Sequence, residues 1–194
     1  MTTQTPASIA ERLTAVNARI RRAEQTYNRE TGSVELLAVS KRHSVAAIRE
    51  AAASGQTAVG ENYLQEAIDK RAQLTDLDLT WHFIGALQSN KTRAAAETFD
   101  WVHAIDRLKI AHRLSEQRPS ELGSLQCCIQ VNVSGEASKA GVSLDEAPAL
   151  AHAIAELPGL RLRGLMTLPE ALTELTEQRA AFRALRECQA QLID

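Results

Sequence analysis

Strand-like runs alternate with helical stretches along most of this 194-residue chain, and this alternation limits the folds open to it. A helical stretch at 8–28 is followed by six strand-like runs, at 34–40, 57–60, 80–85, 101–105, 125–133 and 160–168. Helical periodicity fills the gaps and the end, at 44–53, 64–74, 91–98, 108–117, 144–157 and 174–192. Strands that alternate with helices run parallel and are joined by right-handed crossovers. The pattern predicts an α/β fold with an extra N-terminal helix, built as a (β/α) barrel or as an open doubly wound sheet.

Composition and charge indicate one ordinary globular domain. Apolar residues make up 44% of the chain and charged residues 24%, and a net charge of −2 gives no broad field for nucleic acid or an acidic membrane. No apolar stretch approaches the roughly 20 residues of a membrane helix, and the polar start lacks a signal peptide's apolar core. Three cysteines without a disulfide framework indicate a reducing compartment. We expect a cytoplasmic protein without nucleic-acid or membrane partners.

One lysine stands where the first apolar strand ends. The chain has five lysines, and only Lys41 follows such a strand, after Val34 to Ser40. We expect its amine to be partly desolvated, which disfavours the charged form and makes the amine a better nucleophile toward an aldehyde. The alternative is a lysine that caps the strand and extends its ammonium into water. Position alone leaves both interpretations open.

Other polar residues also follow strands, and parallel strands bring their carboxyl ends to one rim. Asn62 follows the second strand, His82 lies in the third and Met166 in the sixth. Taken singly, these residues are a turn residue, a core histidine and core filling. Taken together with Lys41, they fit a pocket for an aromatic aldehyde. The five histidines show no metal-binding spacing, so we expect no metal site.

Several motifs in sequence order resemble those of the pyridoxal-phosphate homeostasis protein family. They are Leu-Leu-Ala-Val-Ser-Lys at 36–41, Gly-Glu-Asn-Tyr-Leu-Gln-Glu at 60–66, Trp-His-Phe-Ile-Gly-Ala-Leu-Gln-Ser-Asn-Lys at 81–91, Asn-Val-Ser-Gly-Glu-Ala-Ser-Lys-Ala-Gly at 132–141 and Arg-Gly-Leu-Met at 163–166. The resemblance covers nearly the whole chain. It implies a TIM-type (β/α) barrel similar to the barrel domain of alanine racemase.

The resemblance also implies a cofactor and the residues that hold it. Pyridoxal 5′-phosphate (PLP) would form an imine (Schiff base) with Lys41. Asn62, His82 and Met166 would lie near the cofactor ring. Lys139 stands in a loop rich in Gly and Ser, and would be a secondary, transient lysine.

The chain departs from the family pattern in one respect. Family members continue with a seventh and an eighth strand, which carry a Ser/Gly-rich phosphate-binding segment and an Arg-Ile-Gly-Thr stretch, and this sequence contains neither. We therefore expect residues 1–194 to form a single PLP-binding barrel domain that lacks the last two βα units of the family.

The resemblance implies a carrier and regulator of PLP rather than an enzyme. Such a protein takes part in intracellular vitamin B6 homeostasis and in amino- and keto-acid balance, acts as a monomer, and passes PLP to PLP-dependent apo-enzymes. One alternative is a PLP-dependent amino-acid racemase, which needs a second base opposite the lysine. Another is a cofactor-free Schiff-base lyase, which would use the same lysine without PLP.

Overall fold

The computed structural model describes residues 7–136, 139–169 and 173–192. The chain divides into two compact units. The first unit comprises Met1–Glu61 and Gln65–Thr80, and the second comprises Asn62–Leu64 and Trp81–Asp194. Each unit is built of parallel strands and helices and is described by itself.

The first unit contains helix α1 (Ile9–Thr26), strand β1 (Ala38–Val39), helix α2 (Val45–Ala53), strand β2 (Ala58–Glu61) and most of helix α3 (Leu64–Ala72). Helix α1 begins with a capping box in which Ser8 and Glu11 bond each other's backbone N–H groups. The backbone N–H of Ile9 donates to the carboxylate of Glu50 at 3.0 Å and so joins α1 to α2. Strand β1 pairs in parallel with β2.

The first strand is shorter than the sequence predicts. The run 34–40 is strand only at Ala38–Val39, because side chains bind the backbone groups of its beginning. The N–H of Val34 donates to the Glu24 carboxylate, and the carbonyl of Val34 accepts from Arg21. The carbonyl of Leu36 accepts from the amide of Gln56. A segment whose backbone is satisfied in this way needs no neighbouring strand.

The second unit holds a parallel sheet in which β3, β4, β5 and β6 are neighbours in chain order. These strands are β3 (Thr80–Phe83, from Trp81 on), β4 (Trp101–Ile105), β5 (Leu125–Gln130) and β6 (Leu160–Met166). Its helices are η1 (Ser89–Lys91), α4 (Thr92–Thr98), α5 (Leu108–Gln117), η2 (Ser120–Leu122), α6 (Ala147–Ala155) and α7 (Leu175–Ala190).

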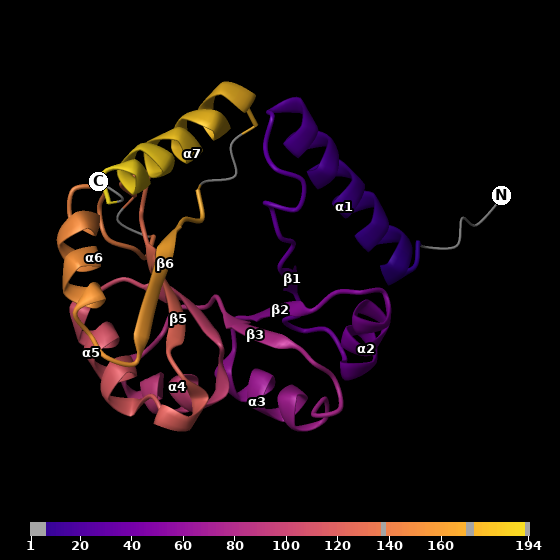
Figure 1. Ribbon diagram of the computed structural model, residues 1–194, viewed down its shortest axis with the longest axis horizontal. Helices are drawn as coiled ribbons and strands as arrows, with labels where there is room; N and C mark the ends of the chain where they lie inside the picture. The colour runs from indigo at the N-terminus through magenta and orange to yellow at the C-terminus, as the bar shows by residue number, and fades with distance from the viewer. Residues whose placement is uncertain (1–6, 137–138, 170–172, 193–194) are drawn as a thin grey trace. The chain divides into compact units, whose positions relative to one another are not determined.

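Helices α4, α5 and α6 cover one side of the β4–β6 strands (Figure 1). The core of this unit includes fully buried apolar side chains of β4, α5 and β5: Val102, Ile105, Ile110, Leu114, Leu125 and Ile129. Packing of this kind supplies most of the favourable free energy of folding. It also gives a rigid base to the loops at the strand ends.

The predicted elements are therefore present, and the α/β class and the N-terminal helix are confirmed. The ends of β5 and β6 come earlier than predicted, at Gln130 and Met166. Within the part of the chain that the structure describes, no helix combines the length and the apolar character needed to cross a bilayer.

Candidate functional site

The predicted site residues fall in both units. Lys41 belongs to the first unit, whereas Asn62, His82, Lys139 and Met166 belong to the second. The surroundings of each residue are defined within its own unit.

Lys41 stands in a tight turn directly after β1. The N–H of His43 donates to the carbonyl of Ser40 at 3.0 Å, which closes the turn around Lys41 and Arg42. Arg42 has a left-handed backbone with φ 62°, as the third residue of a type II turn requires. The Lys41 side chain is exposed. The prediction that the strand end partly desolvates it is wrong, because β1 is itself short and only partly buried, with Val39 45% exposed.

A buried ionic cluster lies beneath this turn. The ammonium of Lys70, whose side chain is 7% exposed, donates to the Ser40 carbonyl, Glu61 Oε1 and Glu66 Oε1, each at 2.7 Å. The Ser40 hydroxyl donates to Glu61 Oε1 at 2.6 Å, and the N–H of Arg42 donates to Glu66 Oε1 at 2.6 Å. The bond from Lys70 is the main cause that lowers the pKa of Glu66 below its usual value. Glu61 is thus a fully buried acid whose Oε1 is satisfied by Ser40 and Lys70.

An aromatic cluster forms in the second unit, where β3 and β4 pair. His82 Nδ1 lies 2.9 Å from His103 Nε2, so one ring nitrogen donates and the other accepts. The His82 ring also stacks on Trp101, with centroids 5.3 Å apart and planes at 15°. The guanidinium of Arg163 lies 5.9 Å from the centroid of Trp101. Burial, helped by the charge of a protonated His103, lowers the pKa of His82 from 6.5 to about 4. Burial also lowers the pKa of His103, so both rings are neutral at physiological pH.

Asn62 lies against the loop that follows β3. A Cβ atom on Gly85 would come within 2.9 Å of Asn62 Cα and closer still to its carbonyl oxygen, so glycine alone permits this approach. The side-chain oxygen of Asn62 is buried and has no hydrogen-bond partner. A buried polar atom without a partner is costly in a folded protein and often marks a ligand position.

Met166 belongs to β6, at the opposite edge of this sheet from β3, and Lys139 stands in the loop after β5. Met166 ends β6, is half-buried, and accepts a hydrogen bond from the N–H of Val131 through its carbonyl. Lys139 forms a 2.8 Å ion pair with Glu136, and this pairing lowers the pKa of Glu136. Asn132 donates to the carbonyl of Glu136 at 2.8 Å and so ties the loop to the sheet.

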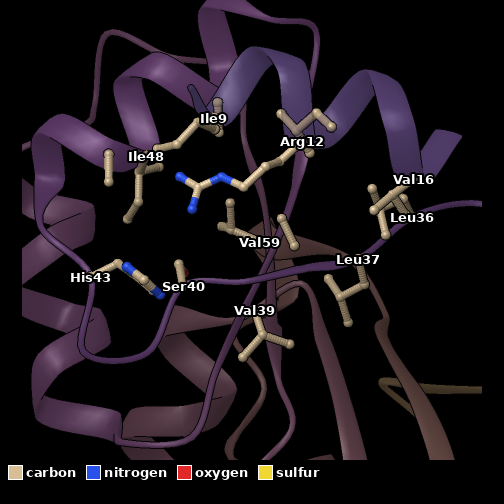
Figure 2. Close-up of a pocket in the computed structure, with 14 residues that line it drawn as sticks. Ile9, Arg12, Val16, Leu36, Leu37, Val39, Ser40, His43, Ile48 and Val59 are labelled. Atoms are coloured by element: carbon tan, nitrogen blue, oxygen red, sulfur yellow. The ribbon is translucent and has the colours of Figure 1, made fainter. Parts of the chain in front are cut away.

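A cavity of about 350 Å³ lies in the first unit between α1, β1 and α2. Figure 2 shows its mostly apolar wall, with the guanidinium of Arg12 directed toward the side that Ile48 lines. Ser40 and His43 reach this cavity, but Lys41 does not line it. It is therefore not the pocket that the sequence predicted around Lys41.

The residues that the structure describes form neither a metal-binding group nor a reactive thiol. No group of three or more His, Cys, Asp or Glu residues there has the geometry to hold a metal ion. The cysteines Cys127, Cys128 and Cys188 are unpaired and buried. Burial raises the pKa of Cys127 to about 12 and that of Cys128 to about 11, so both thiols stay protonated and unreactive.

The sequence did not predict the roles of two groups of residues. Lys70 lies four residues after Glu66 on α3, a spacing that favours a helix ion pair, but nothing in the sequence shows that Glu61 joins them. The pairing of His82 with His103 depends on the register of β3 against β4, in which His82 lies beside Trp101.

Comparison with known proteins assigns the chain to a family. The model of the alanine racemase N-terminal domain matches residues 12–194. The pyridoxal phosphate homeostasis protein of Pseudomonas aeruginosa is 59% identical over 180 residues, which cover 93% of this chain and 78% of that protein. Its counterpart in Vibrio cholerae is 52% identical over 189 residues, covering 95% of this chain and 80% of that protein.

Solved structures agree with this assignment. PipY of Synechococcus elongatus, solved with PLP bound, is 42% identical with a TM-score of 0.80, covering 95% of this chain and 82% of PipY. Alanine racemase of Corynebacterium glutamicum is 21% identical with a TM-score of 0.62, covering 93% of this chain and 49% of the racemase, a likeness of fold alone. The chain therefore belongs to the pyridoxal phosphate homeostasis protein family and has the α/β, TIM-barrel-type fold of the alanine racemase N-terminal domain.

Proposed function

We propose that this protein binds PLP through Lys41 and takes part in intracellular vitamin B6 homeostasis and in amino- and keto-acid balance. The observation that carries the proposal is the position of Lys41. It is the lysine that a closed turn presents at the end of β1, in a family whose members are named for PLP homeostasis. PipY, 42% identical to this chain, was solved with PLP bound.

The residues present fit such a cofactor. PLP supplies an aldehyde and an electron-withdrawing pyridine ring. The exposed amine of Lys41 is the nucleophile that an aldehyde needs. The buried, unpartnered oxygen of Asn62 is free to accept a hydrogen bond from a ligand. In this proposal His82 and Met166 are the neutral aromatic and the apolar residue beside the ring, and Lys139 is a secondary lysine.

The role that we propose is carriage and regulation rather than catalysis. The curated relatives are named as homeostasis proteins, and the likeness to alanine racemase is one of fold only. Racemisation would need a second base opposite the lysine. We propose that residues 1–194 form one PLP-binding domain that acts as a cytoplasmic monomer. Its partners are PLP and the apo-enzymes that receive it, without nucleic acid or membrane.

Borohydride trapping tests the site. After incubation with PLP and reduction, peptide mass spectrometry should find the stable cofactor adduct on Lys41 as the main product. Lys41→Ala should lower the trapped PLP by more than about tenfold and abolish the visible absorption of the complex. Lys109→Ala, which removes another exposed lysine outside the proposed site, is the matched control and should trap PLP like the wild type.

Two results would contradict the proposal. One is an adduct that forms mainly on other lysines while Lys41 stays unmodified. The other is an equal loss of adduct in the Lys41 and Lys109 variants, which would indicate nonspecific modification. A second, weaker adduct on Lys139 that depends on prior loading of Lys41 would support the secondary role of Lys139.

A further inference from the structure

We infer that Lys70, Glu61 and Glu66 are positioning residues that hold Lys41 for reaction with its aldehyde ligand. With Ser40 they form the buried cluster beneath the Lys41 turn, called here the Lys70 cluster. The inference rests on the proposed function of Lys41. In it, the cluster orients the Lys41 amine without contacting the ligand.

The first argument is that every N–H donor of the Lys70 ammonium has an acceptor. An ammonium has three N–H donors, and those of Lys70 meet three acceptors at 2.7 Å: the Ser40 carbonyl, Glu61 Oε1 and Glu66 Oε1. Charge-assisted bonds of this length are strong and directional, most of all away from water. The side chain of Lys70 therefore acts as a rigid link between α3 and the ends of β1 and β2.

The second argument is where these bonds end on the backbone. One ends on the carbonyl of Ser40, the residue before Lys41, and another joins Glu66 to the N–H of Arg42, the residue after it. The Ser40 N–H also donates to the carbonyl of Gly60 at 2.9 Å. Both peptide neighbours of Lys41 are thus fixed while its side chain stays exposed.

The third argument is the backbone conformation of Arg42. A left-handed φ of 62° is unfavourable for a residue with a Cβ atom, and glycine usually occupies such a position. The 2.6 Å bond from the Arg42 N–H to Glu66 Oε1 holds the backbone there. Glu66 thus opposes the relaxation of the turn that would let Lys41 leave its orientation.

The fourth argument is a feature that packing alone does not explain. Glu61 is fully buried, yet its Oε2 has no hydrogen-bond partner. A buried carboxylate with one unpaired oxygen is a costly way to stabilise a fold, because an apolar side chain of similar size would avoid the cost. Such groups persist where a specific geometry is needed.

The same unit contains a matched control, the buried carboxylate of Glu24. Glu24 is 1% exposed and accepts from Arg21 and from the N–H groups of Gly32 and Val34. It joins the end of α1 to the segment before β1, and none of its bonds reaches Ser40 or Arg42. Glu24→Gln therefore disturbs a comparable buried carboxylate without touching the Lys41 turn.

The decisive variants are at Glu66, the most exposed member of the cluster. Glu66→Leu removes the acceptor for Arg42 and Lys70, whereas Glu66→Gln keeps an acceptor oxygen and removes only the charge. Because the Glu66 side chain is already 28% exposed, both variants should fold. Lys70→Met and Glu61→Gln are the more severe tests within the core.

Hydrogen exchange on the chain without PLP measures the turn directly. In Glu66→Leu the amides of Arg42 and His43 should exchange about tenfold faster than in the wild type. Glu66→Gln should restore most of the protection, and Glu24→Gln should leave these two amides unchanged. PLP affinity should follow the same order, with a roughly tenfold loss in Glu66→Leu that Glu66→Gln largely rescues.

The outcomes separate this inference from the proposed function. If the turn loosens in Glu66→Leu but this variant binds PLP as tightly as the wild type, the inference is wrong and the proposed function stands. If PLP does not react with Lys41 even in the wild type, the proposed function fails. The inference is then judged by reductive methylation with formaldehyde, in which Lys41 should lose reactivity relative to Lys109 in Glu66→Leu but not in Glu66→Gln. Equal ratios in all variants would refute it.

Discussion

At the residue scale, the two most informative lysines differ in their surroundings rather than in their chemistry. Lys70 is 7% exposed and gives all its donors to oxygen acceptors, so it is a structural cation. Lys41 is exposed and follows a strand whose end Lys70 holds. An exposed amine on a fixed backbone is suited to bind a ligand, which agrees with the carrier role that we propose.

The neutral His82–His103 pair makes stability depend on pH. The pKa of His82 is about 4 in the folded chain against 6.5 ordinarily, and burial is the main cause. Between pH 4 and pH 6.5, therefore, His82 is mostly protonated in the unfolded chain and mostly neutral in the folded chain. The stabilising contribution is fully present above pH 6.5 and is lost as the pH falls toward 4, on the order of 2–3 kcal/mol in total.

Urea unfolding at about pH 7 and about pH 5 checks this prediction. His82→Gln keeps an amide that can bond His103 but cannot take up the proton, so the fall in stability should be smaller in the variant. His112→Gln, at an exposed position, should behave like the wild type. An identical pH dependence in all three proteins would show that His82 is not held neutral.

At the element scale, the contact between the end of β3 and the turn after β2 depends on a single glycine. Gly85 has no space for a Cβ atom, because the backbone of Asn62 occupies it. This approach brings the backbone of Asn62, whose buried side-chain oxygen has no partner, against the loop that follows the His82 strand. A polypeptide segment that must lie this close to another accepts only glycine.

Gly85→Ala should therefore lower the free energy of unfolding by about 1–3 kcal/mol through overpacking, and it should also weaken PLP binding by moving Asn62. Thermal unfolding and PLP titration measure the two effects. The control is Gly123→Ala, because a Cβ there meets nothing within 4 Å and only the backbone conformation, with its φ of 65°, is unfavourable. Because its ψ of −170° also belongs to a region that almost only glycine adopts, the substitution should cost about 1–3 kcal/mol and leave PLP affinity unchanged. Equal PLP affinity in both variants would show that Asn62 does not contribute to cofactor binding.

At the scale of the whole molecule, the two units differ in how much regular sheet they contain. In the second unit, β5 is paired on both sides, with β4 and β6, and most of its side chains are buried. In the first unit, β1 has only two residues, and Val39 is 45% exposed. The units should therefore differ in local stability, since opening costs most where both backbone pairing and burial are complete.

Native-state hydrogen exchange should show this difference. The amides of Leu125–Gln130 should open only with a free energy near that of global unfolding, about 5–15 kcal/mol, whereas those of residues 34–39 should open far more easily. Because side chains of Glu24, Arg21 and Gln56 replace strand pairing there, Glu24→Gln should speed exchange at Val34 in particular. Slow exchange at 34–39 equal to that of β5 would contradict this account.

Much of the architecture is readable from the linear order of residues, because helical and strand periodicity are local properties. In the part of the chain that the structure describes, each predicted helix and strand is present near its predicted position, and the ordered motifs around Lys41, Asn62, His82 and Met166 indicate the family correctly. The role of these residues toward PLP stays a prediction. The length of the first strand was wrong because distant side chains, not a neighbouring strand, satisfy its backbone.

Only the folded chain decides which polar groups meet. Lys70 and Glu61 are nine residues apart, and they pair because α3 packs back against the ends of β1 and β2. His82 meets His103 through strand register, and Asn62 meets Gly85 because two chain turns cross at contact distance. The alternation of strands and helices follows from hydrophobic periodicity, which is a local property of the sequence. The support beneath Lys41 is decided by the tertiary structure, because buried charges are costly unless they are paired and the pairs form only when the chain folds.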